Sequence, residues 1–297
     1  MRPLRALAIY IAVVFIGGAL LAPWLYWLAQ HFAEQLPGLA RQPFHRFVNR
    51  SMYALALLGL WPLLKNLGAT SPRDAGLVRP AGQGKNLGGG FLLGFLSLAV
   101  VALLALAAGA RAANTGLTAG KLAEKISGAA LTAGAVAVLE EILFRGGIFG
   151  GLRRVFDWRF ALLLSSMIYA IVHFLAPTTD PASVTWSSGF GQLGLMLAGF
   201  ADFQQIVPGF LNLTLAGALL ALAYQRTGNL YFSIGLHAGW IFWLKSYGAL
   251  TKEVAGANTW WWGTGKLVNG WVALPVLAAA LWIFTRLPLA RKRELSL

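Results

Sequence analysis

Residues 128–151, GAALTAGAVAVLEEILFRGGIFGG, form the stretch that decides the fold. The run is long enough to cross about 30 Å of hydrocarbon as one helix. Glu140, Glu141 and Arg145 nevertheless lie inside it. An ionisable side chain at mid-membrane costs roughly 2.5–3.5 kcal/mol on insertion scales, so it requires a partner, a watery cavity or a function. The run therefore predicts a membrane helix that carries a site.

The composition of the whole chain agrees with a membrane protein. Of its 297 residues, 58% are hydrophobic and 11% are charged, whereas soluble domains are about 25% charged. The mean hydropathy is +0.65. The chain has no cysteine, which excludes disulfides, thiolate catalysis and cysteine-based zinc sites.

Apolar periodicity predicts an all-α polytopic transmembrane bundle of about eight spans, forming a single membrane domain over residues 1–297. The expected spans are 6–29, 50–66, 88–110, 128–151, 159–176, 206–225, 229–247 and 268–286. Residues 189–203 are glycine-rich and end beside polar residues, which favours a re-entrant segment. The polar stretches 67–87 and 248–267 are expected to be loops, and the sequence has no internal repeat.

The net charge of +14 comes from basic residues spread over the polar connections. Lys and Arg collect in cytoplasmic loops, so eight spans place both termini in the cytoplasm, with the tail Arg291–Arg293. The basic stretch 41–50 falls on the opposite side and is not explained by this topology. We expect an integral protein of the bacterial plasma (inner) membrane whose partner is the lipid bilayer. No basic arm or aromatic-basic module indicates nucleic acid.

The two glutamates are expected to differ in role. Glu141 and Arg145 are at i and i+4 on a helix, so they share a face and form a charge-neutralising pair. Glu140 is rotated by about 100° from Glu141, which leaves its carboxylate for chemistry.

Two histidines also lie inside apolar spans, His173 and His237. At about 1.5 Å per residue, Glu140, His173 and His237 lie roughly 18, 21 and 12 Å from the cytoplasmic edge. These depths permit the three side chains to meet in one cavity. His31 and His45 are expected in a loop without a role.

Other polar residues carry weaker signals. Ser165 and Ser166 are expected to be packing residues, since small hydroxyls on membrane helices usually pack against neighbours. Asp202 is open between cavity lining and interfacial solvation.

Three ordered motifs resemble those of the CPBP family, the CAAX prenyl endopeptidases and their bacteriocin-processing or self-immunity relatives. Glu140-Glu141-Ile142-Leu143-Phe144-Arg145 matches EExxxR, and Tyr169-Ala170-Ile171-Val172-His173 looks like FxxxH with tyrosine for phenylalanine. The run from Phe210 to His237 resembles the closing helices, which end in HxxxN. The resemblance covers residues 128–245, as a CAAX-protease-like catalytic core.

This resemblance implies an eight-helix membrane bundle and an intramembrane endopeptidase that cleaves a membrane-anchored or membrane-associated peptide or protein. It implies that Glu140 and His173 activate a water, that His237 and the final asparagine of HxxxN stabilise the oxyanion, and that Glu141, Arg145 and Tyr169 support them. A glutamate as general base with oxyanion donors is suitable chemistry for peptide hydrolysis.

The chain departs from the pattern at Ile241, which stands where the motif has asparagine. Losing one oxyanion donor typically costs about 10²–10³ in turnover, unless another donor such as Asn212 serves. No cofactor is expected. A divalent metal such as zinc stays open, with Glu140, His173 and His237 as its ligands, because glutamate and histidine also bind zinc.

Two other function classes are compatible with these residues. A catalytically impaired family member, acting in immunity or as a scaffold, would account for Ile241. A transporter or proton relay would also place carboxylates and histidines in the membrane, although the absence of repeated halves disfavours it. Motifs of other intramembrane proteases are missing: the chain has no HExxH or GxGD, and Trp186-Ser187-Ser188-Gly189 lacks the first glycine of GxSG.

Overall fold

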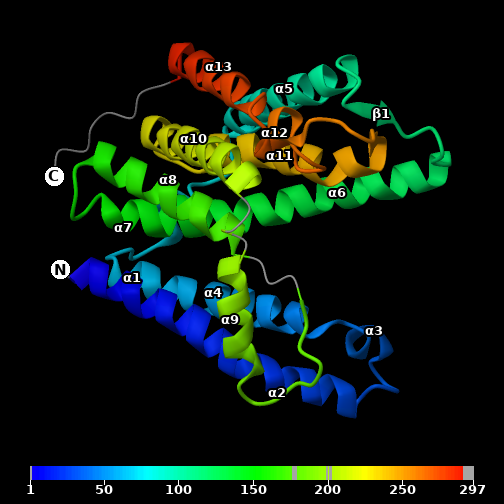
Figure 1. Ribbon diagram of the computed structural model, residues 1–297. Helices are drawn as coiled ribbons and strands as arrows, with labels where there is room; N and C mark the ends of the chain where they lie inside the picture. The colour runs from blue at the N-terminus through cyan, green and yellow to red at the C-terminus, as the bar shows by residue number, and fades with distance from the viewer. Residues whose placement is uncertain (1, 176–178, 199, 201–202, 290–297) are drawn as a thin grey trace. The chain divides into compact units, whose positions relative to one another are not determined.

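The computed structural model describes residues 2–175, 179–198, 200 and 203–289, and it is almost entirely helical (Figure 1). The fold class predicted from the sequence, an all-α membrane bundle, is confirmed. The chain groups into two compact units, each described by itself. Unit 1 comprises Met1–Ala69 and Ile171–Asp202, and unit 2 comprises Thr70–Ala170 and Phe203–Leu297.

Unit 1 is built around a long N-terminal helix. This helix consists of α1 (Arg2–Ala12), a π-helical turn (Val13–Gly17) and α2 (Gly18–His31). After the short α3 (Pro37–Ala40), α4 (Phe44–Asn66) packs against α2, and α9 (Ser188–Ala198) packs against both. A Cβ on Gly189 would collide with the backbone of Ala19, so α2 and α9 touch without an intervening side chain.

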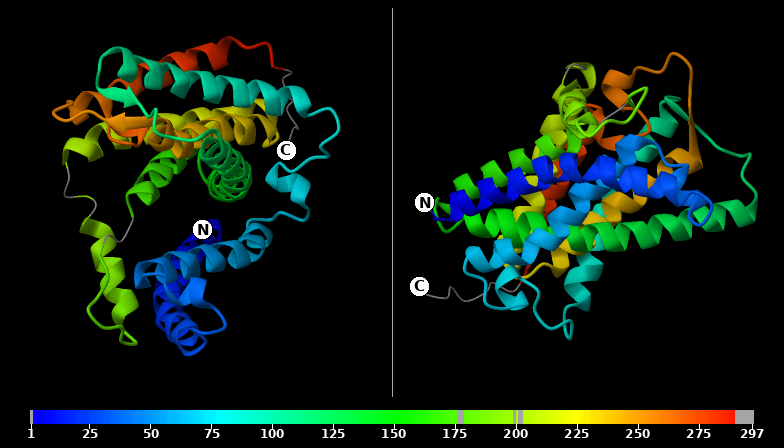
Figure 2. Two further views of the ribbon diagram at one scale, coloured as in Figure 1. Left: turned by 90° about the vertical axis from the view of Figure 1, so that its right-hand side faces the viewer. Right: turned by 90° about the horizontal axis from the view of Figure 1, so that it is seen from below.

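Unit 2 contains the stretch that opened the sequence analysis. Its helices are η2 (Pro72–Ala75), α5 (Gly84–Ala107), α6 (Ala119–Glu141), the π-helical η3 (Ile142–Phe149), α7 (Gly150–Leu152), most of α8 (Trp158–Phe174), α10 (Phe203–Thr227), α11 (Tyr231–Leu250), α12 (Thr259–Trp262), η5 (Leu267–Asn269) and α13 (Ala273–Arg286). Its core is apolar and joins α5, α10, α11 and α13. The helix α13 lies alongside α5 (Figure 2).

The closest helix contact in unit 2 joins α5 to α11. Each helix presents two glycines four residues apart, Gly90 and Gly94 on α5 and Gly235 and Gly239 on α11. A Cβ on any of the four would meet backbone atoms of the other helix. Small residues at this spacing allow membrane helices to approach closely. This glycine seam fixes α11, and with it His237, relative to α5.

The expected loops carry one short antiparallel ribbon that the sequence did not predict. The strand β1 (Arg111–Ala113) pairs with β2 (Thr251–Glu253), with Arg111 opposite Glu253. Arg111 is buried, and its guanidinium donates to the hydroxyl and to the backbone carbonyl of Thr251. The ribbon ties the loop after α5 to the end of α11.

Within the described residues, five helical segments are long and apolar enough to cross a membrane: Pro3–His31, Phe44–Asn66, Gly84–Ala107, Ala119–Leu152 and Ile206–Thr227. Two further apolar helices, α8 and α13, are shorter. The predicted span 229–247 corresponds to α11, which is not among the five although it has 20 residues. Its residues are largely buried and include polar ones such as Ser233, His237 and Ser246. Helix neighbours rather than lipid therefore surround it.

The segment expected to be re-entrant forms α9, whose 11 residues span only about 16 Å. Asp202 and the tail 291–293 lie outside the described residues. His31 and His45 are not loop residues as expected, since they lie in α2 and α4. His45 also binds Asp180, through its backbone N–H at 2.7 Å and through Nδ1 at 3.0 Å.

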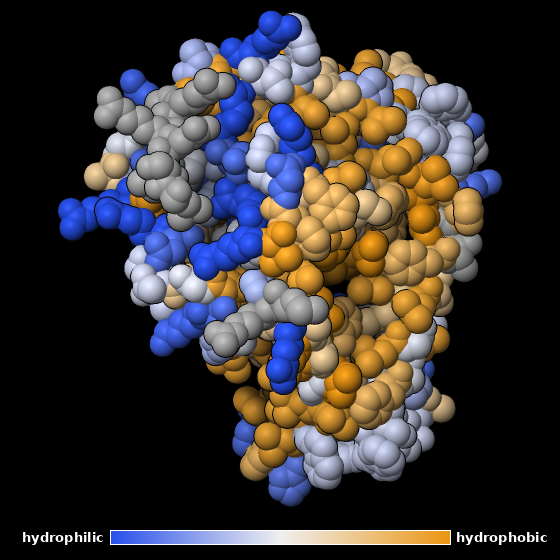
Figure 3. Space-filling view, turned by 90° about the vertical axis from the view of Figure 1, so that its left-hand side faces the viewer, coloured by the Kyte–Doolittle hydropathy of each residue, from blue (hydrophilic) through white to orange (hydrophobic). Residues whose placement is uncertain are grey.

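Hydrophobic side chains cover much of the face shown in Figure 3. Leu131 is 77% exposed and Leu58 is 74% exposed. Exposed leucines on this scale fit lipid contact, and the protein is an integral membrane protein.

Candidate active site

The site begins where α6 changes its winding. Glu140 and Glu141 are the last two residues of α6, and η3 continues from Ile142 with π-helical hydrogen bonds. Short π-helical stretches inside α-helices frequently occur at functional sites, because the wider turn redirects side chains. The Glu141 side chain is fully buried, whereas that of Glu140 is 24% exposed. The two carboxylates therefore have different access to solvent or substrate, as their angular separation predicted.

The expected ion pair between Glu141 and Arg145 is present. Glu141 Oε1 lies 3.1 Å from Arg145 Nη1. Arg145 is 2% exposed and also donates to the carbonyl of Gly217 on α10. Its guanidinium lies 4.7 Å from the centre of the Tyr169 ring. A buried charge needs such a set of partners, so Arg145 holds α6, α8 and α10 together around the carboxylates.

His237 on α11 connects both carboxylates. Its Nδ1 lies 2.9 Å from Glu141 Oε1, and its Nε2 lies 3.8 Å from Glu140 Oε2. The Nε2 atom is also 3.2 Å from the Tyr169 hydroxyl. A carboxylate can only accept, so Nδ1–H donates to Glu141 and Nε2 faces Tyr169 and Glu140. His237 itself is 3% exposed.

Sequence reasoning missed this second role of Glu141. We expected Glu141 to pair only with Arg145, but it also fixes the orientation and tautomer of His237. The spacing within one helix revealed the first contact. The second joins residues 96 positions apart, and only the packing of α6 against α11 creates it.

His173 is an exposed residue in the last turn of α8, four positions after Tyr169. It belongs to unit 1, while Glu140, Tyr169 and His237 belong to unit 2. The two units are described separately, so its meeting with Glu140 stays a prediction.

Asn212 is not available as the substitute oxyanion donor that the sequence suggested. It is fully buried, and its amide nitrogen donates to the carbonyls of Val268 and Gly270. Both hydrogens of the amide are thus used to hold the segment around η5. Ile241 is buried one turn after His237 and offers no donor.

Ser165 and Ser166 act as the packing residues expected. Both hydroxyls donate to the carbonyl of Leu162 on their own helix. A Cβ on Gly217 would lie 3.0 Å from Ser166 Cα, so α8 and α10 approach closely here.

A loop before α5 braces the far end of the site helices. A Cβ on Gly146 would lie 2.9 Å from the Ala75 carbonyl, and the backbone N–H of Leu230 donates to Gly76. Asp74 caps this loop: hydrogen bonds from the backbone N–H groups of Thr70 and Ser71, with the Thr70 hydroxyl, lower the pKa of Asp74 from 3.8 to about 2.

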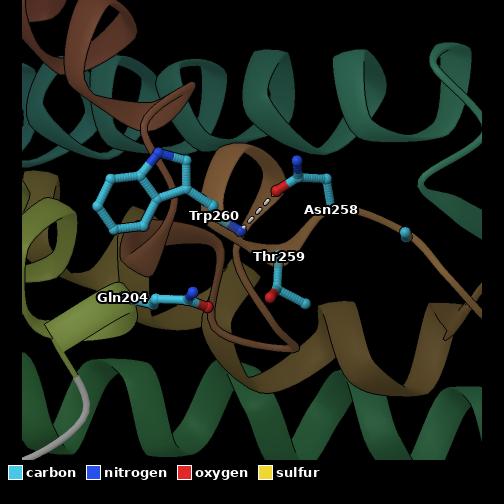
Figure 4. Close-up of a pocket in the computed structure, with 5 residues that line it drawn as sticks. Gln204, Asn258, Thr259 and Trp260 are labelled. Atoms are coloured by element: carbon cyan, nitrogen blue, oxygen red, sulfur yellow. Dashed lines mark hydrogen bonds between the residues drawn. The ribbon is translucent and has the colours of Figure 1, made fainter.

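Two hollows lie elsewhere in unit 2. One, of about 470 Å³, is lined by Gln204 at the start of α10 and by residues 257–260, where the Trp260 backbone N–H donates to Asn258 (Figure 4). The other is an apolar groove of about 620 Å³ between α5 and α13. Neither is lined by Glu140, Glu141 or His237.

Residues 123–243 match the family model described as Type II CAAX prenyl endopeptidase Rce1-like. The chain carries an Rce1-like domain. This finding confirms the family resemblance that the motifs indicated. The Rce1-like domain contains Glu140, Glu141, Arg145, Tyr169, His173 and His237. Searches among curated proteins and among solved structures found no match to the chain. The similarity of residues 123–243 to this family points to a protease.

Proposed function

We propose that the protein is an intramembrane endopeptidase of the CAAX-protease type that cleaves a membrane-associated peptide or protein. The observation that carries the proposal is the convergence of Glu140 and His237, 3.8 Å apart, within the Rce1-like domain. Structural ion pairs alone would account for the buried Glu141 and Arg145. They do not account for a second, partly exposed carboxylate beside the same histidine.

In the proposed reaction, Glu140 accepts a proton from a water molecule as the water attacks the scissile carbonyl carbon, and His173 assists. Glu140 is the more exposed of the two carboxylates, and its Oε2 lies 3.8 Å from His237 Nε2. The proton then passes to the leaving amine as the C–N bond breaks. His237, oriented by Glu141, contributes to stabilising the oxyanion.

We propose that this reaction needs no metal. A metal bound by Glu140, His173 and His237 would have to take the Nε2 atom of His237, which contacts Tyr169, because Nδ1 is engaged by Glu141. Cleavage by protein purified without metal and assayed with a chelator tests the proposal, and loss of activity restored by zinc would overturn it.

The peptidase assignment is tested with a membrane-anchored reporter peptide. Glu140→Ala and His173→Ala are each expected to abolish cleavage, while both proteins insert and keep the melting temperature of the wild type. Leu131→Ala, on the lipid-exposed face of α6, is the matched control and should cleave normally. Wild-type cleavage by both site variants would contradict the assignment.

A second candidate function is a catalytically impaired family member acting in immunity or as a scaffold. Ile241 favours it, because Asn212 does not replace the missing donor. This candidate predicts that the wild type does not cleave the reporter and that Ile241→Asn gains cleavage.

A further inference from the structure

Two differences from the family motifs fall on the same site. Ile241 removes a hydrogen-bond donor from HxxxN, and Tyr169 adds one to FxxxH. We propose that the Tyr169 hydroxyl is a catalytic oxyanion donor that replaces the missing asparagine. This inference rests on the proposed peptidase function and identifies a residue that the motif itself does not supply.

The position of the hydroxyl supports this role. Tyr169 Oη lies 3.2 Å from His237 Nε2, the same nitrogen that lies 3.8 Å from Glu140 Oε2. The hydroxyl, the imidazole and the reactive carboxylate therefore surround one small volume. In the proposed geometry, water held at Glu140 would attack the carbonyl carbon while the carbonyl oxygen lies beside the Tyr169 hydroxyl.

The tyrosine ring is held in place before any substrate binds. Tyr169 is 3% exposed, the Arg145 guanidinium lies 4.7 Å from its ring centre, and Phe144 packs edge-on at 5.1 Å. Donors that are fixed in a water-poor site stabilise developing charge strongly, because they need no reorganisation during the reaction. Packing on two sides gives Tyr169 this property.

The hydrogen atoms balance in the proposed step. Without substrate, the Tyr169 hydroxyl and His237 Nε2 share a hydrogen bond, and His237 Nδ1–H donates to Glu141. With substrate, the O–H turns to the carbonyl oxygen. Water attack forms the C–O bond, moves the carbonyl electron pair to that oxygen and passes a proton to Glu140. Collapse breaks the C–N bond, and the amine takes the proton from Glu140. Tyr169 keeps its proton throughout.

Two other candidate donors, Trp240 and Asn212, already have partners. The Trp240 indole N–H, next to Ile241, donates to Ser97, and the Asn212 amide donates to Val268 and Gly270. The Tyr169 hydroxyl instead contacts the proposed catalytic histidine.

A four-variant comparison of reporter cleavage tests the replacement. The variants are wild type, Tyr169→Phe, Ile241→Asn and the double variant, with kcat and KM measured for each. Tyr169→Phe should lower kcat by about 10²–10³-fold with little change in KM, because the bond forms mainly in the transition state. The kcat of the double variant should be at least about tenfold higher than that of Tyr169→Phe, because the asparagine restores the family's donor.

Tyr247→Phe is the matched control, since Tyr247 is a buried tyrosine packed on Arg111 outside the site. It should cleave at the wild-type rate. If Ile241→Asn fails to fold, inhibition by a peptide ketone, whose hydrate mimics the tetrahedral intermediate, gives a second measurement. Tyr169→Phe should then weaken ketone binding far more than it raises KM, and equal changes would overturn the proposal.

The outcomes separate this inference from the peptidase assignment. Full activity of Glu140→Ala contradicts the assignment itself. Loss of activity in Glu140→Ala with an unchanged kcat in Tyr169→Phe overturns only the role of Tyr169. A fall in Tyr169→Phe that Ile241→Asn does not repair would also overturn it, since Tyr169 would then act by orienting His237.

Discussion

The helix α11 has two contact regions that differ in chemistry. Against α5 it presents Gly235 and Gly239, and the backbones touch. Against α6 it presents His237, which meets Glu140 and Glu141. The first region contains no ionisable side chain among these contacts, and the second contains the proposed reactive groups. The comparison shows that the close glycine contact between α5 and α11 fixes the position of His237, which faces the glutamates of α6.

Breaking the glycine seam should have the largest effect. Gly94→Val directs a side chain into the backbone of Leu236, which cannot rotate away. We expect a loss of more than about 3 kcal/mol in the free energy of unfolding and loss of cleavage. Thermal unfolding of detergent-purified protein measures it.

Gly88→Val provides the control on the same helix, because a Cβ at Gly88 meets nothing within 4 Å. It should melt like the wild type. Equal melting temperatures for the two valine variants would show that the seam does not hold α11.

Within the polar region, the two glutamates should separate stability from activity. Glu141→Gln leaves the buried charge of Arg145 without its counter-charge, which costs roughly 3–5 kcal/mol. Glu140→Gln affects a partly exposed side chain and should change stability by less than about 1 kcal/mol. Unfolding curves of both variants measure the difference, and equal destabilisation would contradict the division of roles.

A change at Asp74, in the loop that packs against Gly146, should have the smallest effect on stability, and this effect should depend on acidic pH. The pKa of Asp74 is lowered to about 2 by hydrogen bonds from Thr70 and Ser71. A lowered pKa means that Asp74 stabilises the fold above pH 3.8 and that this contribution is lost as the pH falls towards about 2.

Asp74→Asn should therefore lower the melting temperature slightly at pH 7 and flatten its dependence between pH 4 and about 2. Melting curves of wild type and variant across this range measure the effect. An unchanged slope would show that Asp74 does not couple to folding.

The sequence predicted the fold class and the membrane helices because lipid selects long apolar runs, and these are visible in one dimension. It predicted the Glu141–Arg145 pair for a similar reason, since i and i+4 meet on any helix. The contact of His237 with Glu141 was not predictable in this way, because it depends on how α11 packs.

The fate of Asn212 illustrates the same limit. Asn212 was named as a substitute donor, but its side-chain amide donates to carbonyls 56 and 58 positions further along the chain. The sequence showed only that Tyr169 stands where the FxxxH motif has phenylalanine, and it did not indicate the proposed role of the hydroxyl. Its distance to His237 gives that departure a chemical meaning.

The central claim is that the polar region of α11 is an active site and not only a buried ion-pair network. Reporter cleavage and melting temperature, measured on the same preparation of Glu140→Gln, test it most directly. The account predicts a wild-type melting temperature with cleavage reduced to background. Cleavage at the wild-type rate by this folded variant would contradict it.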